Sequence, residues 1–273
     1  MSMTGTYPRK HDALRPARRS TTAYGRISAI GRTELTLLMR NKSAVFIALF
    51  MPVLLTFSFR AAAEEFDLAG TGLDVTSVLL PSAIGFVLLF AVYNNLTTAF
   101  VARREELVLK RLRTGELSDN EILLGTATPM LFTGLVQMAL LGVGGTLALD
   151  AGAPSHFWWL IAGVLTGLVI AAGLAALTAS YSRTVETAGI TVLPLMLVSA
   201  FGSGMLVPTE LLPDAVVPFL EFFPLSPVVA LIREGWTGRT DTTEMLLQLL
   251  GAIAWSAVAV VATRRIFRWE PRR

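Results

Sequence analysis

The chain has 273 residues, of which 53% are hydrophobic and 16% are charged, and its formal net charge is +3. An average soluble domain has roughly 25% charged residues, so this balance indicates a membrane protein. The sequence has no cysteine, which excludes disulfides and thiolate metal sites, and its basic residues lie at the ends of apolar segments, which argues against a nucleic-acid partner.

The N-terminal part precedes the first apolar segment. Residues 1–25 combine basic side chains with small and polar ones, which is typical of a disordered tail near anionic lipid. Residues 26–42 carry apolar and basic side chains at helical spacing, and we expect an amphipathic helix there that lies along the membrane surface. Anchoring to lipid would account for this helix without any protein partner.

Six apolar segments are each long enough for a membrane-spanning helix, which needs about 20 residues. They are residues 43–59, 75–101, 122–149, 157–181, 188–207 and 245–266. The chain is therefore predicted to be an all-α integral membrane protein with six transmembrane helices in a domain at residues 43–273. A cleaved signal peptide is the alternative for the first segment, since three alanines follow it at 61–63. About 42 residues precede this segment and Arg60 interrupts the approach to the alanines, so we expect the helix to be retained.

The distribution of basic residues predicts the orientation of these helices. Of the 23 Lys and Arg residues, 20 lie in the termini and in the connections on the same side of the membrane. Cytoplasmic connections are rich in Lys and Arg, so both termini are predicted to be cytoplasmic. The connection at residues 102–120 is then cytoplasmic as well.

Residues 102–120 are densely charged. Apolar side chains at Val108, Leu109 and Leu112 fall on one face of a short predicted helix in this segment. Either the segment is a solvated loop that only fixes the orientation, or its apolar edge docks in a groove on another protein. The fork-shaped arginine side chains near this edge favour docking.

Local pairing and capping signals define the ends of this short helix. Glu106 and Lys110 have the spacing of a favourable i,i+4 pair, and Gly115 is expected to close the helix as a C-terminal cap. Ser118 and Glu121 then have the form of a capping box, which predicts that the next helix begins here.

Polar side chains within the spans are costly in a bilayer. Those we single out are Tyr93, Asn94, Asn95 and Gln137. They would either line a translocation path or form hydrogen bonds between helices, and for any single residue we favour the hydrogen bond. Gly163 and Gly167 form a small-residue pair that we expect to serve packing within the chain.

Residues 208–232 contain five prolines, too many for a continuous span. We predict an outer re-entrant hairpin of short helices that dip back into the outer leaflet before the last span. Phe219, Phe222 and Phe223 cluster in this segment, and we predict that they form an apolar gate at the outer mouth.

Together these features resemble the membrane permease subunits of ABC type 2 exporters, the group that includes the daunorubicin-type drug-resistance exporters of actinomycetes. ELTLLMRNKSAVFIALFMPVLL, at residues 34–55, looks like the interfacial helix, charged elbow and first span of that family. RREELVLKRLRTGELSDNEILLG, at residues 103–125, is similar to its charged coupling loop. Residues 203–235 look like the stretch after the fifth span, with its outer hairpin, and the six-span layout also matches.

The resemblance implies an exporter of two permease copies, as a homodimer, and two cytoplasmic P-loop ATPase subunits that bind ATP and Mg²⁺. No G-x-x-x-x-G-K-[ST] motif occurs in this chain, so it would itself be no enzyme and would hold no cofactor or metal. The resemblance implies that the ATPase contacts this chain at Arg103, Arg104, Glu105, Glu106, Leu109, Arg111, Leu112 and Arg113. Arg32, Glu34 and Arg40 of the interfacial helix would lie beside it.

Three other classes of membrane protein are the alternatives. An intramembrane enzyme lacks its parts, because the sequence has two histidines, no H-E-x-x-H motif and no convergent carboxylates within the spans. An ion-coupled secondary transporter would need intramembrane charge, for which Glu186 beside Arg183 is the closest candidate. A non-transporting scaffold for a soluble partner stays open. We predict export of a hydrophobic or amphiphilic compound, such as a drug, an antibiotic or a lipid-like molecule, across the bacterial cell (inner) membrane.

Overall fold

The computed structural model describes most of the chain after the N-terminal tail. The described residues are 22–43, 45–46, 50, 54, 75–115, 117–148, 152–206, 213, 215–216, 219–220, 222–239 and 241–270. Within them the structure is all-helical, as the sequence predicts. The predicted tail, most of the first predicted span and nine of the 25 residues of the predicted outer hairpin lie outside the described residues.

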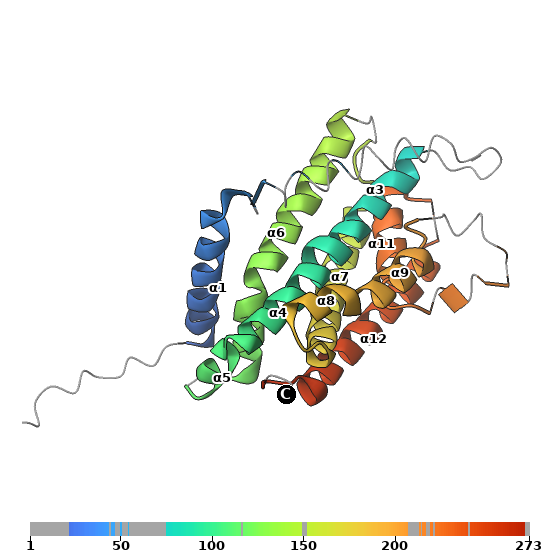
Figure 1. Cartoon of the computed structure of the whole chain (residues 1–273). Coiled ribbons are helices and arrows are strands. Elements are labelled where there is room, and N and C mark those ends of the chain that lie inside the picture. The colour runs from blue at the N-terminus through green and yellow to red at the C-terminus, as the bar shows by residue number, and fades with distance from the viewer. Residues whose placement is uncertain are drawn as a thin grey trace, which may run out of the picture.

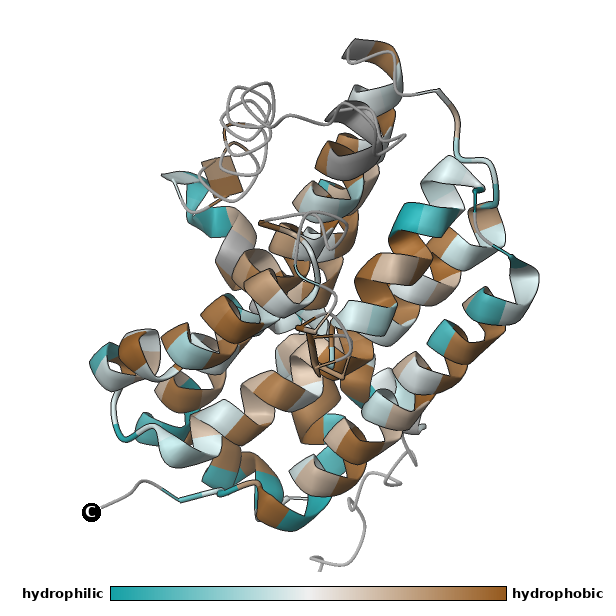
Figure 2. Cartoon of the chain, turned by 90° about the vertical axis from the view of Figure 1, so that its right-hand side faces the viewer, coloured by the Kyte–Doolittle hydropathy of each residue, from teal (hydrophilic) through white to brown (hydrophobic). Residues whose placement is uncertain are grey.

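Five segments are long and apolar enough to cross a membrane, and they confirm five of the six predicted spans. The first is a continuous rod of α3 (Val75–Val87), the π-helix η1 (Leu88–Asn94) and α4 (Asn95–Glu105). The others are α6 (Asp119–Ala148), α7 (Phe157–Tyr181), α8 with α9 (Val185–Thr191 and Leu193–Gly202) and α12 (Thr242–Ile266). Hydrophilic residues gather toward the ends of these helices, while hydrophobic residues fill their lengths (Figure 2).

The α3–η1–α4 rod lies at the centre of the bundle (Figure 1). It packs against α6 on one flank and against α7 and α11 (Ser226–Thr237) on the other. Its side chains are almost all buried along η1, from Leu88 to Tyr93, with Phe90 the exposed exception. The hydrophobic core is therefore built around this rod.

Close packing between α7 and α11 depends on small residues. A Cβ atom added at Gly163 would lie 2.8 Å from Cγ1 of Ile232, and one added at Gly167 would lie 2.8 Å from Cγ1 of Val228. Both glycines are buried and face α11 of the same chain. The small-residue pair thus serves packing within the chain, as predicted.

The helix α11 follows a proline-rich segment and begins at Ser226, with Pro227 in its first turn. An α-helix tolerates proline there, because backbone N–H groups of the first turn have no partner within the helix. At its other end Gly238 has φ +60°, a left-handed conformation that glycine adopts without strain. These two residues set the bounds of α11.

Candidate functional site

The charged segment forms a sharp turn between α4 and α5 (Val108–Arg113) at one end of the bundle, low in Figure 1. Leu107 has φ 59°, a left-handed conformation that is rare for a residue with a side chain. This residue ends α4 and starts α5 in a new direction, while its own side chain is 41% exposed. An exposed leucine in a costly backbone conformation at the tip of a turn is a candidate contact residue.

The break at Leu107 changes the predicted pairing of charges. Glu106 accepts a hydrogen bond from Arg103 Nη1 at 2.9 Å, and Lys110 Nζ lies 2.8 Å from Glu270 Oε1. The predicted Glu106–Lys110 pair is therefore wrong. Its spacing assumed one continuous helix, which the chain does not form here.

Two residues of the predicted ATPase contact lie inside the protein. Arg104 is 1% exposed and donates hydrogen bonds from Nη1 to Ala179 O, at 2.7 Å, and from Nη2 to Ser182 O. Leu109 is fully buried, so the apolar edge predicted for docking is turned inward instead. Between residues 103 and 113 the exposed side chains are those of Glu105, Glu106, Leu107, Lys110, Arg111 and Arg113, while Arg103, Val108 and Leu112 are half-buried.

The C-terminal segment folds back beside the same turn. Arg113 pairs with Asp119 through Nε, 3.0 Å from Oδ1, and its guanidinium carbon lies 5.0 Å from the centre of the Trp269 ring. Trp269 in turn packs edge-on against Phe267. Sequence reasoning missed Trp269 and Glu270, because nothing local links them to a segment more than 150 positions earlier. We name the exposed residues Glu105–Leu107, Lys110, Arg111 and Arg113, with Trp269 and Glu270, the charged-end surface.

The predicted capping box is present at the start of α6. Ser118 N donates to Glu121 Oε2 at 2.8 Å, and Glu121 N donates to Ser118 Oγ at 3.4 Å. The other oxygen of Glu121 accepts from Arg26 Nη2 at 2.6 Å and Nε at 3.1 Å. Gly115 lies beyond the end of α5 without positive φ, and its N–H donates to Leu112 O, so the helix is capped by Thr114 instead.

The amphipathic helix α1 (Ala23–Arg40) runs alongside α6. A Cβ atom at Gly125 would lie 2.7 Å from Ile30 Cβ, and one at Gly31 would lie 2.8 Å from Thr128 Cγ2. Together with the Arg26–Glu121 pair, these contacts advance in step along both helices, so α1 follows α6 in the same direction (Figure 1). Of the residues predicted beside the ATPase, Arg32 and Arg40 are exposed, and the side chain of Glu34 lies outside the described ones.

Substitution of Arg26 by glutamine is expected to loosen α1 from α6. It removes the side chain that joins α1 to the capping box through Glu121, which is itself nearly buried. Hydrogen exchange of the α1 amides should become several-fold faster than in the unmodified chain. The matched change Arg32→Gln, at an exposed position of the same helix, should leave exchange unaltered; equal rates in all three proteins would show that the pair does not hold α1.

The polar side chains predicted for a translocation path differ in their burial and in their partners. Tyr93 is 1% exposed and its hydroxyl lies 3.0 Å from Thr178 Oγ1 on α7, while Gln137 is 2% exposed. Asn94 is half-buried and Asn95 is exposed, with Nδ2 donating to Ala91 O of its own helix at 3.4 Å. For Tyr93 the interhelical hydrogen bond is the role that the geometry shows. A role in a translocation path stays a prediction for the set.

Replacement of Tyr93 by phenylalanine tests this interhelical role. Loss of one such hydrogen bond in a membrane protein costs about 0.6 kcal/mol on average, so a small fall in the unfolding temperature is expected with no change in transport. Thr178→Val should have the same effect, and the double variant should add nothing further. A change of transported substrate in Tyr93→Phe alone would instead place the hydroxyl in the path.

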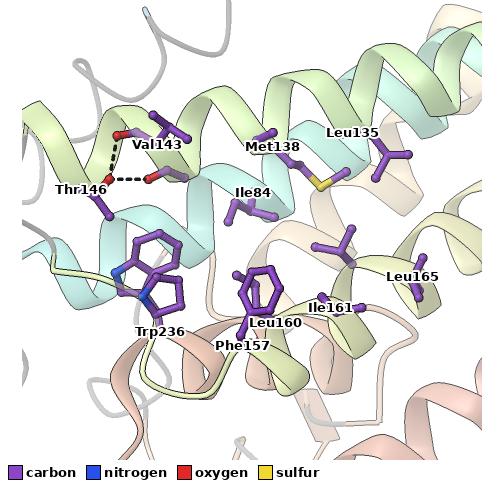
Figure 3. A pocket seen from close by; sticks show the side chains of 14 residues that line it. Ile84, Leu135, Met138, Val143, Thr146, Phe157, Leu160, Ile161, Leu165 and Trp236 are labelled. Carbon is purple, nitrogen blue, oxygen red and sulfur yellow. Dashed lines mark hydrogen bonds between the residues drawn. The ribbon is translucent and has the colours of Figure 1, made fainter.

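A furrow runs between α6 and α7. Ile84 and Phe100 of the α3–η1–α4 rod contribute to its lining. It holds a cavity of about 380 Å³ near the charged end, lined by residues of α4, α6, α7 and α12. A second cavity of about 520 Å³ follows toward the far end. Figure 3 shows this far cavity, with Leu135, Met138 and Val143 of α6 facing Phe157, Leu160, Ile161 and Leu165 of α7 across it.

An ABC-2 type transporter family model matches residues 26–235, which run from α1 through nearly all of α11. The chain belongs to the ABC-2 type transporter family. No curated protein matches the chain. The family match makes it a multi-pass membrane permease component that lacks the ATPase domain, and permeases of this family generally pair with ABC ATPase subunits. The match is to the family as a whole, and it assigns no drug-resistance subgroup and no substrate.

The phenylalanines predicted as an outer gate of this ABC-2 permease are only partly gathered. Phe219 packs edge-on against Phe223, with ring centres 5.4 Å apart, and Phe222 packs instead against Trp255 of α12 at 5.7 Å. Phe219 and Phe222 are exposed. The three rings therefore divide between two contacts, and a gating role stays a prediction.

Proposed function

We propose that this ABC-2 permease is one half of an ATP-driven exporter that carries a hydrophobic or amphiphilic compound out of the cell. A separate P-loop ATPase, in two copies that bind ATP and Mg²⁺, supplies the energy, and a second copy of this chain completes the membrane part. The charged-end surface at the α4–α5 turn carries this proposal. It has exposed charges of both signs around an exposed leucine, at the end of α4, which Arg104 joins to α7 by a hydrogen bond.

The orientation follows from the positions of the basic residues. One end of the bundle holds the α4–α5 turn, the start of α1 and the end of α12 (Figure 1). Together they carry nine of the 15 Lys and Arg residues in the described part of the chain. The positive-inside rule favours this end as cytoplasmic, with the chain in a bacterial cell (inner) membrane and both termini inside. The ATPase would then meet the charged-end surface from the cytoplasm, beside the start of α1 at Arg26. Arg40 ends α1 about 20 Å further along α6, so the predicted place of Arg40 beside the ATPase does not agree with the course of α1.

The cargo class rests on what the membrane part can offer. The described parts of the spans carry apolar side chains with a few hydroxyls and amides, and the basic residues lie near their ends. Such a lining suits a drug, an antibiotic or a lipid-like compound better than an ion. Asn94 and Asn95 are the members of the predicted path set that are not buried, and they are the first candidates for cargo contact.

Transport into inside-out membrane vesicles tests export and cargo class together. Vesicles that contain this chain and its ATPase should accumulate amphiphilic fluorescent dyes when ATP is added. Replacement of the P-loop lysine of the ATPase should abolish the accumulation, since that lysine holds the phosphates of ATP. Accumulation that persists with this ATPase variant and collapses with the proton gradient would instead establish an ion-coupled transporter.

A further inference from the structure

The two cavities of the α6–α7 furrow lie end to end along the same two helices, and together we call them the track. Leu131 lines the cavity near the charged end, and Leu135, one turn further along α6, lines the far one. On α7, Leu168 lines the cavity near the charged end and Leu165 lines the far one. Each cavity falls within the range of roughly 300–1,000 Å³ that is usual for ligand pockets.

The walls of this track are apolar and open to the side. Leu135, Val143 and Leu165 line the far cavity and are each about half exposed, although they belong to membrane-spanning helices. The hydroxyl of Thr146, a polar residue of that lining, donates to Val143 O of its own helix at 2.8 Å (Figure 3). Water has too few polar partners in such a track, so hydrocarbon is the filler that a bilayer would supply.

The cavity near the charged end has a basic and an amide side chain in its lining. Arg264 and Asn120 line the cavity near the charged end, and both side chains are exposed. Thr263 lines it too, but its hydroxyl already donates to Gly173 O at 3.2 Å. Within the described part of the chain, Arg264 takes part in none of the ion pairs. A cation and an amide at the mouth of an apolar track complement an anion that carries a hydrocarbon chain.

We propose that the α6–α7 furrow binds an anionic glycerophospholipid. Its phosphate lies at Arg264 and Asn120, and an acyl chain extends along α6 and α7 from the charged-end cavity toward the far one. Basic pockets between membrane-spanning helices are known to select anionic lipid headgroups, which agrees with this placement. The lipid is a bound component of the permease rather than its cargo, so the site does not depend on the proposed export. In the proposed orientation it belongs to the inner leaflet.

The full chain in nanodiscs of equal phosphatidylglycerol and phosphatidylcholine tests the headgroup contact. After extraction into mild detergent, native mass spectrometry should show phosphatidylglycerol bound in preference to phosphatidylcholine. Arg264→Gln should lower this preference about fivefold, which is the effect of one basic residue on anionic lipid. Arg265→Gln removes the same charge from the next position, which does not line the cavity, and should leave the preference unchanged.

A second variant tests the acyl track separately from charge. Ala172→Phe places a ring in the charged-end cavity and should reduce the amount of both bound lipids, whereas Val258→Phe, at an exposed position of α12 outside both cavities, should not. Unfolding temperatures identify any variant that fails to fold, and Ala172→Leu then replaces Ala172→Phe. An unaltered lipid preference in Arg264→Gln, an equal loss in Arg265→Gln, or full lipid content in Ala172→Phe would each overturn the proposal.

Discussion

Replacement of Arg104 by alanine is expected to destabilise the permease by about 3 kcal/mol, since each hydrogen bond to a charged group contributes about 1.5–3 kcal/mol. The guanidinium is buried and donates to Ala179 O and Ser182 O, the first within the last turn of α7 and the second just beyond it. Carbonyl groups there have no partners within the helix, so the substitution leaves them unsatisfied as well as detaching α4 from α7. Thermal unfolding in detergent, followed by tryptophan fluorescence, measures the loss.

Two further variants show whether the shape of the Arg104 side chain matters. Arg104→Lys keeps the charge but offers a single ammonium group, which cannot reproduce the fork that serves two carbonyls, so an intermediate loss is expected. Arg103→Ala removes a neighbouring arginine whose ion pair with Glu106 is solvent-accessible, and such pairs contribute about 0–1 kcal/mol. Equal unfolding temperatures for Arg104→Ala and Arg103→Ala would contradict the role assigned to Arg104.

Gly235→Ala is expected to cost about 2 kcal/mol through overpacking between α11 and α7. The new Cβ would lie 2.5 Å from Leu160 N and 2.8 Å from Leu160 Cα, both of them backbone atoms that cannot rotate away. The two helices would have to separate, and this would also loosen the packing of Gly163 against Ile232. The same thermal unfolding measurement detects this loss.

The matched control for this change is Gly144→Ala in α6. A Cβ atom at Gly144 meets nothing within 4 Å, and alanine favours helix over glycine by about 1 kcal/mol, so this variant should unfold at the same or a higher temperature. If both alanine variants shifted the unfolding temperature alike, close approach of α11 to α7 would not explain the cost.

The spans could be predicted because the bilayer imposes a length and a composition on each helix. The start of α6 could be predicted as well, since Ser118 and Glu121 act on backbone groups within one turn. The packing of Gly163 and Gly167 within the chain was also predicted, from the four-residue spacing of the two small residues. For the spans and the start of α6, the partner is the membrane itself or a group close in sequence. The partners of Gly163 and Gly167 lie far away in α11, and only the spacing of the two glycines is local.

The charged segment was harder to predict because its side chains pair over long distances in sequence. Arg104 bonds to carbonyls of α7, and Lys110 pairs with Glu270 at the other end of the chain. The pattern of apolar residues placed Leu109 on an exposed face because it assumed that the helix runs on without a break. The left-handed conformation of Leu107 has no sequence signal, since this conformation favours glycine and asparagine rather than leucine.

The measurement that tests the central claim most directly is co-purification of the tagged permease with its P-loop ATPase. Glu106→Arg combined with Leu107→Asp changes two exposed side chains of the charged-end surface, whereas a change at the buried Leu109 would disturb the fold. Glu186→Arg reverses an exposed carboxylate in the first turn of α8 and serves as the matched control. We predict that the ATPase co-purifies with the unmodified chain and with Glu186→Arg, and is lost from an intact double variant. Undiminished binding of the ATPase to the double variant would contradict the assignment of this surface, and the absence of any ATPase partner would contradict the ATP-driven mechanism.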